Sequence, residues 1–446
     1  MRTYDLIVLG SGGAGYQVAT KAREAGWDVA VVNDGPFGGT CAVRGCIPKK
    51  VLAGSAEVAD THRRLQNIGI IDSDITMNWQ ETIAFKRSFT DSVSGSTKDA
   101  LNKDGIDTYE GSPRFTDNLT LEVNGETISG KNLHIAVGAK PASLPIPGFE
   151  HAITSDDFLE LDDLPKRIVF VGGGYVSFEL AHVAARFGSE VTILQNDDKP
   201  LAIFDRDVIS TLLEATKSVG IQVELNHPVG KVERNNAGFN VTANDTVFPA
   251  DLVVNGAGRP PAIADLNLEA TGVDYDKRRG VSVDANLQST SNPNVTAAGD
   301  AADAGPPLSP VAGVQGGIVA HNLLHEEKRS QPSYLSTPSV IFTTPTVGMV
   351  GHSQASAEAA GLDVTVVSND ITGWFDSKRL GIKHAMSKII VENKTDKILG
   401  AHLIGNHAED LINIFALAVE LELTREQLKA PIMAFPTASD DLRSML

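Results

Sequence analysis

Two glycine-rich turns, each between a predicted β-strand and a predicted α-helix, constrain the fold of this chain more than any other feature. The first has the pattern G-x-G-x-x-G over residues 10–15, after an apolar strand at 4–9. A helix at 16–25 and a second strand at 28–32 follow it. In that setting the pattern is typical of a dinucleotide-binding βαβ unit, because glycines let the backbone approach a pyrophosphate and the helix N-terminus supplies free N–H groups. The alternative is a tight turn without a ligand.

The same arrangement recurs later in the chain. A strand at 167–171 leads into three glycines at 172–174, a helix at 175–187 and a strand at 190–194. Two such units predict an α/β fold with two Rossmann-like domains and two bound nucleotides. A flavin with a nicotinamide is the pair that we expect, and hence hydride transfer between them.

An amide residue ends the second strand of each unit, where an acidic residue usually holds the ribose hydroxyls. These residues are Asn33 and Gln195, and Asp34 is expected to share the work at the first. No arginine that would favour a 2′-phosphate follows Gln195, although Lys199 is near. The sequence therefore favours NAD(H) over NADP(H).

Composition excludes several classes of function. Of 446 residues, 38 are Lys or Arg and 56 are Asp or Glu, which gives a formal net charge of −18. Such an acidic chain without basic clusters is a poor candidate for binding nucleic acid or anionic membrane. No apolar run approaches the roughly 18 residues of a membrane span, and no basic region precedes the first apolar stretch. We expect a cytoplasmic enzyme with a small-molecule substrate.

The chain has only two cysteines, Cys41 and Cys46. Their number excludes a disulfide framework and a four-thiolate metal site, and no metal centre is predicted. A buried structural pair is the alternative to a reactive one.

Around these cysteines the sequence GGTCAVRGCIPKK, at residues 38–50, resembles the class I pyridine nucleotide–disulfide oxidoreductases, the relatives of glutathione reductase, dihydrolipoamide dehydrogenase and mercuric reductase. The resemblance covers essentially the whole chain. Further matching segments are 135–141, 172–179, 256–260, 297–300, 341–345 and 398–405.

The resemblance implies an FAD domain, an inserted NAD(P) domain and a C-terminal α+β domain that forms a homodimer. The expected ranges are 1–150 and 271–333 for the FAD-binding and central parts, 151–270 for NAD(P) and 334–446 for the interface.

The resemblance also implies roles for single residues. Cys41 would be the interchange thiol that meets the substrate, and Cys46 the thiol nearer the flavin. Asp300 would accept a hydrogen bond from the ribityl chain, with a turn or cap residue as the alternative. Tyr175 would cover the nicotinamide pocket, with an ordinary surface tyrosine as the alternative.

Glu179 would form an ion pair near the reactive nitrogen of the flavin, with Lys49 or Lys50 as its partner. The spacing does not separate the two lysines. Together the motifs and the resemblance predict cofactor-binding residues at Gly10, Gly12, Gly13, Gly15, Asn33, Asp34, Gly39, Thr40, Lys50, Gly138, Gly172, Gly174, Tyr175, Glu179, Gln195, Asn196, Gly258, Arg259, Gly299 and Asp300.

The sequence departs from the family near its C-terminus. Disulfide reductases of the family carry His-Pro-Thr there, and the histidine acts as acid and base for the interchange thiol. This chain has Phe435 before the Pro-Thr and keeps an acid at Asp440. Phenylalanine transfers no proton, so dithiol exchange should be slow unless another group serves.

Other departures narrow the substrate. The places where glutathione reductases hold peptide carboxylates with arginines are Val18, Ala19 and Gly317 here. Mercuric reductases and the larger thioredoxin reductases use a further thiol or selenol pair, and no third cysteine exists.

Three hypotheses follow. The first is an FAD enzyme that passes electrons from NAD(P)H to a Cys41–Cys46 disulfide and on to a disulfide, a quinone-like molecule or a metal ion. The second is a conventional glutathione or lipoamide enzyme with a replacement base. The third is a non-catalytic flavoprotein that serves as a binding partner.

Overall fold

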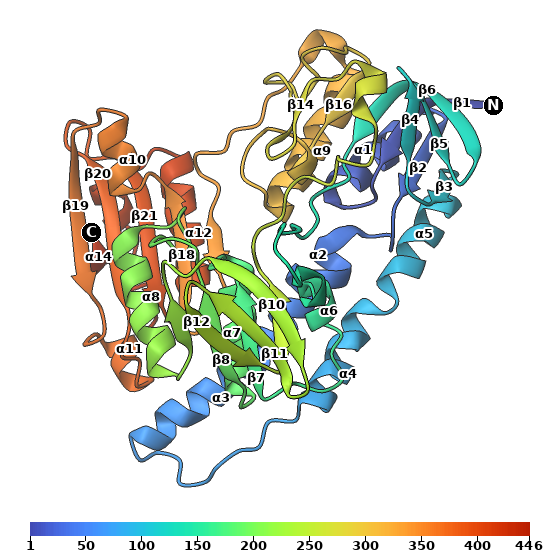
Figure 1. The fold of residues 1–446 in the computed structure, drawn as a ribbon. Helices are drawn as coiled ribbons and strands as arrows, with labels where there is room; N and C mark the ends of the chain where they lie inside the picture. Colours follow the sequence, from blue (N-terminus) through green and yellow to red (C-terminus); the bar gives the residue numbers. More distant parts are fainter. The chain divides into compact units, whose positions relative to one another are not determined.

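The computed structural model describes residues 1–446, and the chain divides into two compact units (Figure 1). Unit 1 comprises residues 1–48, 84–142 and 259–334, and unit 2 comprises 49–83, 143–258 and 335–446. Helices pack with a mixed sheet in unit 1 and with one parallel and two antiparallel sheets in unit 2, which confirms the predicted α/β class.

A seven-stranded sheet forms the centre of unit 1, in the order β3-β2-β1-β6-β5-β4, with β16 beside β6. The strands β1, β2, β3, β6 and β16 pair in parallel, whereas β4, β5 and β6 form an antiparallel meander. These strands are β1 (Arg2–Leu9), β2 (Val29–Asn33), β3 (Asp107–Glu110), β4 (Arg114–Asp117), β5 (Thr120–Val123), β6 (Glu126–Ile135) and β16 (Val295–Ala297).

Both faces of this sheet are buried. Along β1, Ile7 and Leu9 belong to one apolar cluster and Leu6 and Val8 to another, as expected for a strand of alternating side chains covered on both sides. The unit also contains α1 (Gly13–Glu24), α2 (Gly39–Arg44), α5 (Val93–Lys103), α9 (Ser309–Leu324), the short strands β14 (Tyr275–Asp276) and β15 (Gly280–Val281), and the 3₁₀ turns η2 (Leu268–Thr271), η3 (Gly299–Ala301) and η4 (Glu326–Lys328).

The glycine that begins each nucleotide-type turn is required by its backbone. Gly10 has a φ of +103°, and a Cβ there would lie 2.2 Å from the carbonyl oxygen of Ala136. Gly172 has a φ of +102°, and its Cβ would lie 2.5 Å from the carbonyl oxygen of Gly256. Only glycine fits either place without displacing the neighbouring strand connection.

Unit 2 contains the second βαβ unit, built on a parallel sheet of order β13-β7-β8-β9. An antiparallel sheet of order β10-β11-β12 accompanies it. The elements are η1 (Phe149–His151), α6 (Ser155–Phe158), β7 (Arg167–Val171), α7 (Tyr175–Arg186), β8 (Glu190–Leu194), α8 (Arg206–Ser218), β9 (Gln222–Glu224), β10 (Val229–Asn235), β11 (Gly238–Ala243), β12 (Thr246–Ala250) and β13 (Leu252–Asn255).

The C-terminal part of unit 2 is a five-stranded antiparallel sheet of order β17-β18-β21-β20-β19, and the apolar helix α12 packs on it. Its elements are β17 (Ser339–Ile341), β18 (Thr346–Gly351), α10 (Gln354–Ala359), β19 (Val364–Asp370), α11 (Phe375–Arg379), β20 (Met386–Glu392), β21 (Ile398–Gly405), α12 (Ala408–Glu420), α13 (Arg425–Lys429) and α14 (Leu442–Met445). Two helices, α3 (Cys46–Asn67) and α4 (Trp79–Thr90), begin in one unit and end in the other.

The alternating residues 109–137 predict antiparallel strands, and β4, β5 and β6 form such a meander. Only β3, which ends at Glu110 at the start of this range, differs, because it pairs in parallel with β2. Long-range pairing with the first βαβ unit decides the direction of β3, and alternation alone carries no information on it.

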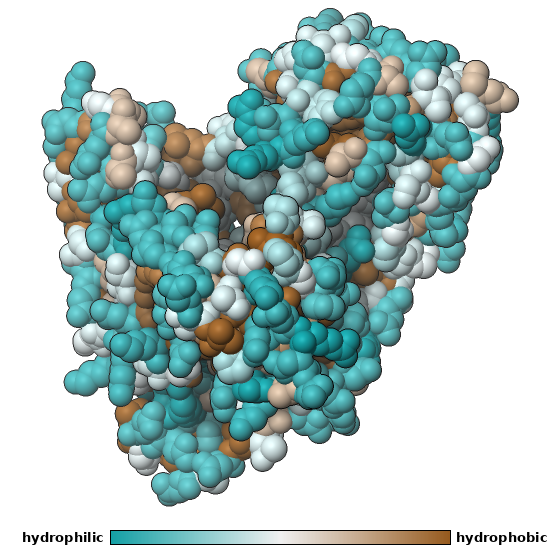
Figure 2. Space-filling model, in the orientation of Figure 1, coloured by the Kyte–Doolittle hydropathy of each residue, from teal (hydrophilic) through white to brown (hydrophobic).

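Among the helices of this chain, none combines the length and the apolar character that a membrane span requires. The face shown in Figure 2 is largely hydrophilic, with hydrophobic residues in small scattered groups.

Candidate redox and nucleotide-binding sites

The first glycine turn leaves the N-terminus of α1 open. Gly12 is the N-cap and offers no capping side chain, and no acidic residue lies in the first turn of the helix. A Cβ on Gly13 would meet nothing closer than 3.8 Å, whereas one on Gly39 would lie 2.5 Å from the Cα of Gly12. The turn and the start of α2, which also carries Thr40, therefore form a backbone-lined cradle. Such a cradle with unpaired N–H groups fits a pyrophosphate.

Asn33 braces this turn. Its Oδ1 accepts hydrogen bonds from the backbone N–H and the hydroxyl of Ser11, both at 2.9 Å. Its Nδ2 donates to the carbonyl oxygens of Gly35 and Pro36, at 2.8 and 3.1 Å. The amide is thus fully engaged within the protein, and Asp34, whose side chain is exposed, is the acceptor left for a ribose at the end of β2.

Gln195 does the same in the second unit. Its Oε1 accepts from the backbone N–H of Gly173 at 2.7 Å, and its Nε2 donates to Asp197 at 2.6 Å. Asn196 beside it is exposed. In both units the amide thus holds the N–H that follows the first glycine of the turn. The sequence predicted ribose contacts for both amides, and this bracing role was missed.

The second turn presents the N-terminus of α7 as the first presents that of α1. Gly174 is its N-cap without a capping side chain, and Tyr175 begins the helix with 51% of its surface exposed. Gly258 lies in the turn after β13, with open space where a Cβ would stand. This arrangement fits a second dinucleotide.

Asp300 is a half-buried carboxylate in unit 1. It follows Gly299 in the turn after β16, and desolvation by burial raises the pKa of Asp300, partly offset by the charge of Arg259. The Arg259 guanidinium also donates to the carbonyl oxygen of Ala139, next to Gly138, at 3.0 Å. A buried carboxylate is stabilised by a hydrogen-bond donor, and a ligand hydroxyl is such a donor.

The two cysteines lie close together as free thiols. Cys41 is in α2, Cys46 begins α3 and is exposed, and the two share a hydrogen bond. The Sγ of Cys46 lies 3.4 Å from the hydroxyl oxygen of Ser309, the first residue of α9. The hydrogen bond to Cys46 and burial raise the pKa of Cys41, and Ser309 lowers it.

Ser309 is a residue that sequence reasoning missed. In the sequence, residues 309 and 310 are a Ser-Pro pair, which is common where helices begin and does not indicate a contact with a thiol. The contact with Cys46 depends on the fold, since the two residues are far apart in the chain.

The buried ion pair of unit 2 involves Lys49 and not Lys50. The Nζ of Lys49 lies 2.7 Å from Oε1 of Glu179, whose side chain is 3% exposed. The same Oε1 accepts from the backbone N–H of Phe342 at 2.8 Å. Lys50 instead places its Nζ 4.2 Å from the centroid of the Phe342 ring. A pair with a second hydrogen bond is the arrangement in which a buried charge is tolerated.

In the C-terminal segment, Phe435 occupies the position where disulfide reductases of the family are expected to carry the histidine base. Phe435 is 81% exposed, and Ile432 nearby is 93% exposed. Asp440 is half-buried, and burial raises the pKa of its neighbour Asp441, with the charges of Asp376 and Asp440 adding to the effect. Phe435 and Asp440 lie in unit 2 and the cysteines in unit 1.

Comparison with known proteins agrees with this geometry. Residues 4–316 match the family described as pyridine nucleotide-disulphide oxidoreductase, and residues 337–446 match its dimerisation domain. Mercuric reductase from Staphylococcus aureus is 32% identical over 99% of this chain and 81% of its own length. Dihydrolipoyl dehydrogenase from Bacillus subtilis is 30% identical over 98% of this chain and 94% of its own.

Among solved structures, the Cu(II) complex of the HOCl-induced flavoprotein disulfide reductase RclA from Escherichia coli is similar. It superposes with a TM-score of 0.90 at 28% identity, over 100% of this chain and 99% of that one.

Proposed function

The chain belongs to the pyridine nucleotide–disulphide oxidoreductase family, and from this premise we propose that it is an FAD-dependent enzyme that transfers electrons from NAD(P)H to the Cys41–Cys46 pair and on to an acceptor. The observation that carries the proposal is the hydrogen-bonded thiol pair, because a scaffold protein has no need of it. The third hypothesis, a non-catalytic flavoprotein, is therefore disfavoured.

The residues fit the two nucleotides. The cradle of Gly12, Gly13 and Gly39 would hold the FAD pyrophosphate, and Asp300 would accept from a ribityl hydroxyl. Bound FAD would supply a two-electron carrier between NAD(P)H and the thiols. The proposed division is FAD binding by 1–150 and 271–333, NAD(P) binding by 151–270 and dimer formation by 334–446.

NAD(H) is the proposed nicotinamide nucleotide. At the end of β8, Gln195 donates to Asp197 and the backbone N–H of Lys199 also donates to it. These hydrogen bonds lower the pKa of Asp197, so its carboxylate is ionised. A fixed negative charge there repels a 2′-phosphate, and no arginine offsets it.

The thiol chemistry starts from a protonated Cys41. The hydrogen bond to Cys46 and burial raise the pKa of Cys41, and we propose Cys46, which is exposed and lies beside the Ser309 hydroxyl, as the thiolate of the reduced pair. In the reductive half, NAD(P)H and one proton convert the disulfide into two thiols and NAD(P)⁺. In the oxidative half, the thiols lose two electrons and two protons and the disulfide re-forms.

We propose an acceptor that needs no general base at position 435, namely thiol-reactive metal ions such as Cu(II), which becomes the softer Cu(I) on reduction. Two Cu(II) ions take the two electrons and become Cu(I), and the protons leave as the thiolates bind metal. The absence of a histidine at Phe435 supports this choice, as does the similar structure solved as a Cu(II) complex. A dithiol–disulfide exchange would lack help worth about 10²–10⁴-fold in rate.

The test compares acceptors on the FAD-loaded enzyme with NADH. We expect Cu(II) to be reduced faster than glutathione disulfide or lipoamide by about 100-fold. Phe435→His should raise the disulfide rates and leave Cu(II) reduction unchanged, with Phe435→Leu as the matched control. Turnover of either disulfide at the Cu(II) rate would instead favour a conventional enzyme with a replacement base. Cu(II) reduction that survives Cys41→Ser would refute thiol transfer.

We also propose a homodimer. The dimerisation-domain match and the exposed apolar side chains of Ile432 and Phe435 support it. A cytoplasmic location stays a prediction from the sequence.

A further inference from the structure

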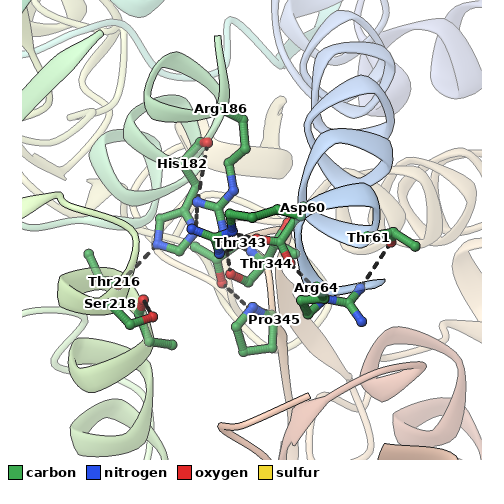
Figure 3. Close-up of polar contacts among 12 residues, drawn as sticks. Asp60, Thr61, Arg64, His182, Arg186, Thr216, Ser218, Thr343, Thr344 and Pro345 are labelled. Carbon is green, nitrogen blue, oxygen red and sulfur yellow. Dashed lines mark hydrogen bonds and ion pairs between the residues drawn. The ribbon is translucent and has the colours of Figure 1, made fainter. Parts of the chain in front are cut away.

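Three side chains of α7 hold one segment of the chain. Glu179, His182 and Arg186 follow one another at helical spacing, and each bonds to the backbone of Phe342 or Thr344. Oε1 of Glu179 accepts from Phe342 N at 2.8 Å, and Nδ1 of His182 accepts from Thr344 N at 3.2 Å. The Arg186 guanidinium donates to the Thr344 carbonyl oxygen at 2.9 Å (Figure 3).

The imidazole of His182 is fixed as a neutral acceptor. Its Nδ1 also receives a hydrogen bond from Arg186 at 3.1 Å, so the ring proton belongs on Nε2, which lies 3.0 Å from the hydroxyl of Thr216 in α8. Burial and then the charge of Arg186 lower the pKa of His182. The buried ring is therefore neutral, and its Nδ1 serves as a hydrogen-bond acceptor. Its lone pair is committed to Thr344 and Arg186.

Arg186 connects this group to α3. Its side chain is 5% exposed and forms an ion pair with Asp60 at 3.0 Å. Asp60 also forms ion pairs with Arg63 at 2.8 Å and with Arg64 at 2.9 Å. Lys49 lies three turns earlier on the same helix. The α7 side chains that bond to the segment at 342–344 are therefore themselves tied to α3 by the Arg186–Asp60 ion pair.

Phe342 connects the segment at 342–344 to the Lys49–Glu179 ion pair. Its N–H shares Oε1 of Glu179 with the ammonium group of Lys49, which also lies 4.4 Å from the centroid of the Phe342 ring. A shift of the segment would therefore change both the counter-ion and the aromatic neighbour of Lys49.

We infer that His182 and Arg186 are positioning residues for the Lys49–Glu179 pair and act through residues 342–344; this inference rests on the proposed function, in which that pair lies beside the flavin as the family resemblance implies. A purely structural site could be filled by apolar side chains at little cost, since a buried polar group is stabilising only when each of its partners is kept. Here two of the three partners of His182 lead to this segment: the N–H of Thr344 belongs to it, and Arg186 bonds to its carbonyl oxygen and to α3.

The test uses three variants of the FAD-loaded protein. His182→Leu removes the acceptor for Thr344 N, whereas His182→Asn keeps an acceptor oxygen near the place of Nδ1. Thr216→Val is the matched control, because it removes the bond on the far side of the ring and a bond to the Leu212 carbonyl oxygen within α8, but none to residues 342–344. The readouts are the rate of flavin reduction by NADH under anaerobic stopped flow, the NADH dissociation constant and the melting temperature.

We expect His182→Leu to slow flavin reduction about tenfold or more, with NADH affinity little changed, since small displacements at a reacting site cost rates of this order. His182→Asn should restore most of the rate, and Thr216→Val should keep it. A His182→Leu variant that melts earlier but reduces at the wild-type rate would overturn the inference. If that variant loses FAD, Arg186→Gln takes its place with the same criteria.

Lys49→Ala and Glu179→Gln, measured in parallel, separate this inference from the proposed function. If neither changes flavin reduction, the proposed role of the pair is wrong. If both change it and the His182 and Arg186 variants do not, only the positioning inference is wrong.

Discussion

At the scale of single residues, the thiol pair depends on a hydroxyl that no motif revealed. Ser309 lies within hydrogen-bonding distance of Cys46, and a hydroxyl that donates to a thiolate stabilises it. Removing it with Ser309→Ala should raise the pH at which the reduced enzyme forms its thiolate by about 0.5–1 pH unit. The long-wavelength absorption of a thiolate beside bound FAD, followed against pH, measures this. Ser309→Thr keeps the donor and should titrate like the wild type; equal curves for all three proteins would exclude the role.

His134 makes the stability of unit 1 depend on pH. It is fully buried in β6, and desolvation lowers the pKa of His134 from 6.5 to about 3. Below pH 6.5 His134 therefore binds a proton in the unfolded chain but stays neutral in the folded chain. The free energy of unfolding consequently falls as the pH falls from 6.5 toward 3. This group should lower the free energy of unfolding by about 2 kcal/mol between pH 7 and pH 5.

The difference between wild type and His134→Gln, measured by urea unfolding at the two pH values, isolates that contribution. The glutamine amide does not titrate, so its variant should lose about 2 kcal/mol less over this range. Identical pH slopes would show that His134 is protonated in the folded protein.

The sequence predicted which residues lie at the redox and nucleotide-binding sites, but it did not predict which atoms those residues contact. Choosing Lys49 over Lys50 requires the rotational phase of α3 against α7, which no local pattern carries. The bracing roles of Asn33 and Gln195 likewise follow from how the loop after each strand folds back on its glycine turn.

At the scale of elements, the βαβ units could be predicted because strand, glycine turn and helix are signalled locally. The predicted strands at 167–171 and 190–194 match β7 and β8 residue for residue. The direction of β3 could not be predicted, since it depends on its partner strand.

The start of α8 shows how one element is fixed to another. Asp205 is its N-cap, accepts from the backbone N–H of Asp207, and pairs at 3.0 Å with Lys388 of β20, whose side chain is 6% exposed. Asp205→Ala removes the cap and leaves the lysine only the exposed Asp207, so it should cost about 3 kcal/mol of unfolding free energy. Asp207→Asn, a surface change, should cost about 0.5 kcal/mol. Denaturant unfolding measures both; similar losses would contradict a buried anchor at Asp205.

At the scale of the whole molecule, two dinucleotide-type units and one thiol pair define the proposed electron path. The sequence could indicate this division because each part has its own motif. It could not indicate the acceptor, because the relevant feature is a missing group at Phe435, and an absent base leaves several acceptors open.

The central claim, that electrons pass from NADH to the Cys41–Cys46 disulfide, is tested most directly by an anaerobic reductive titration that counts electrons per bound FAD. Wild-type protein should take up two electron pairs, one for the disulfide and one for the flavin, and show the long-wavelength band after the first. Cys46→Ser should take up one pair and show no band. Uptake of a single pair by the wild type, or of two pairs by Cys46→Ser, would contradict the account.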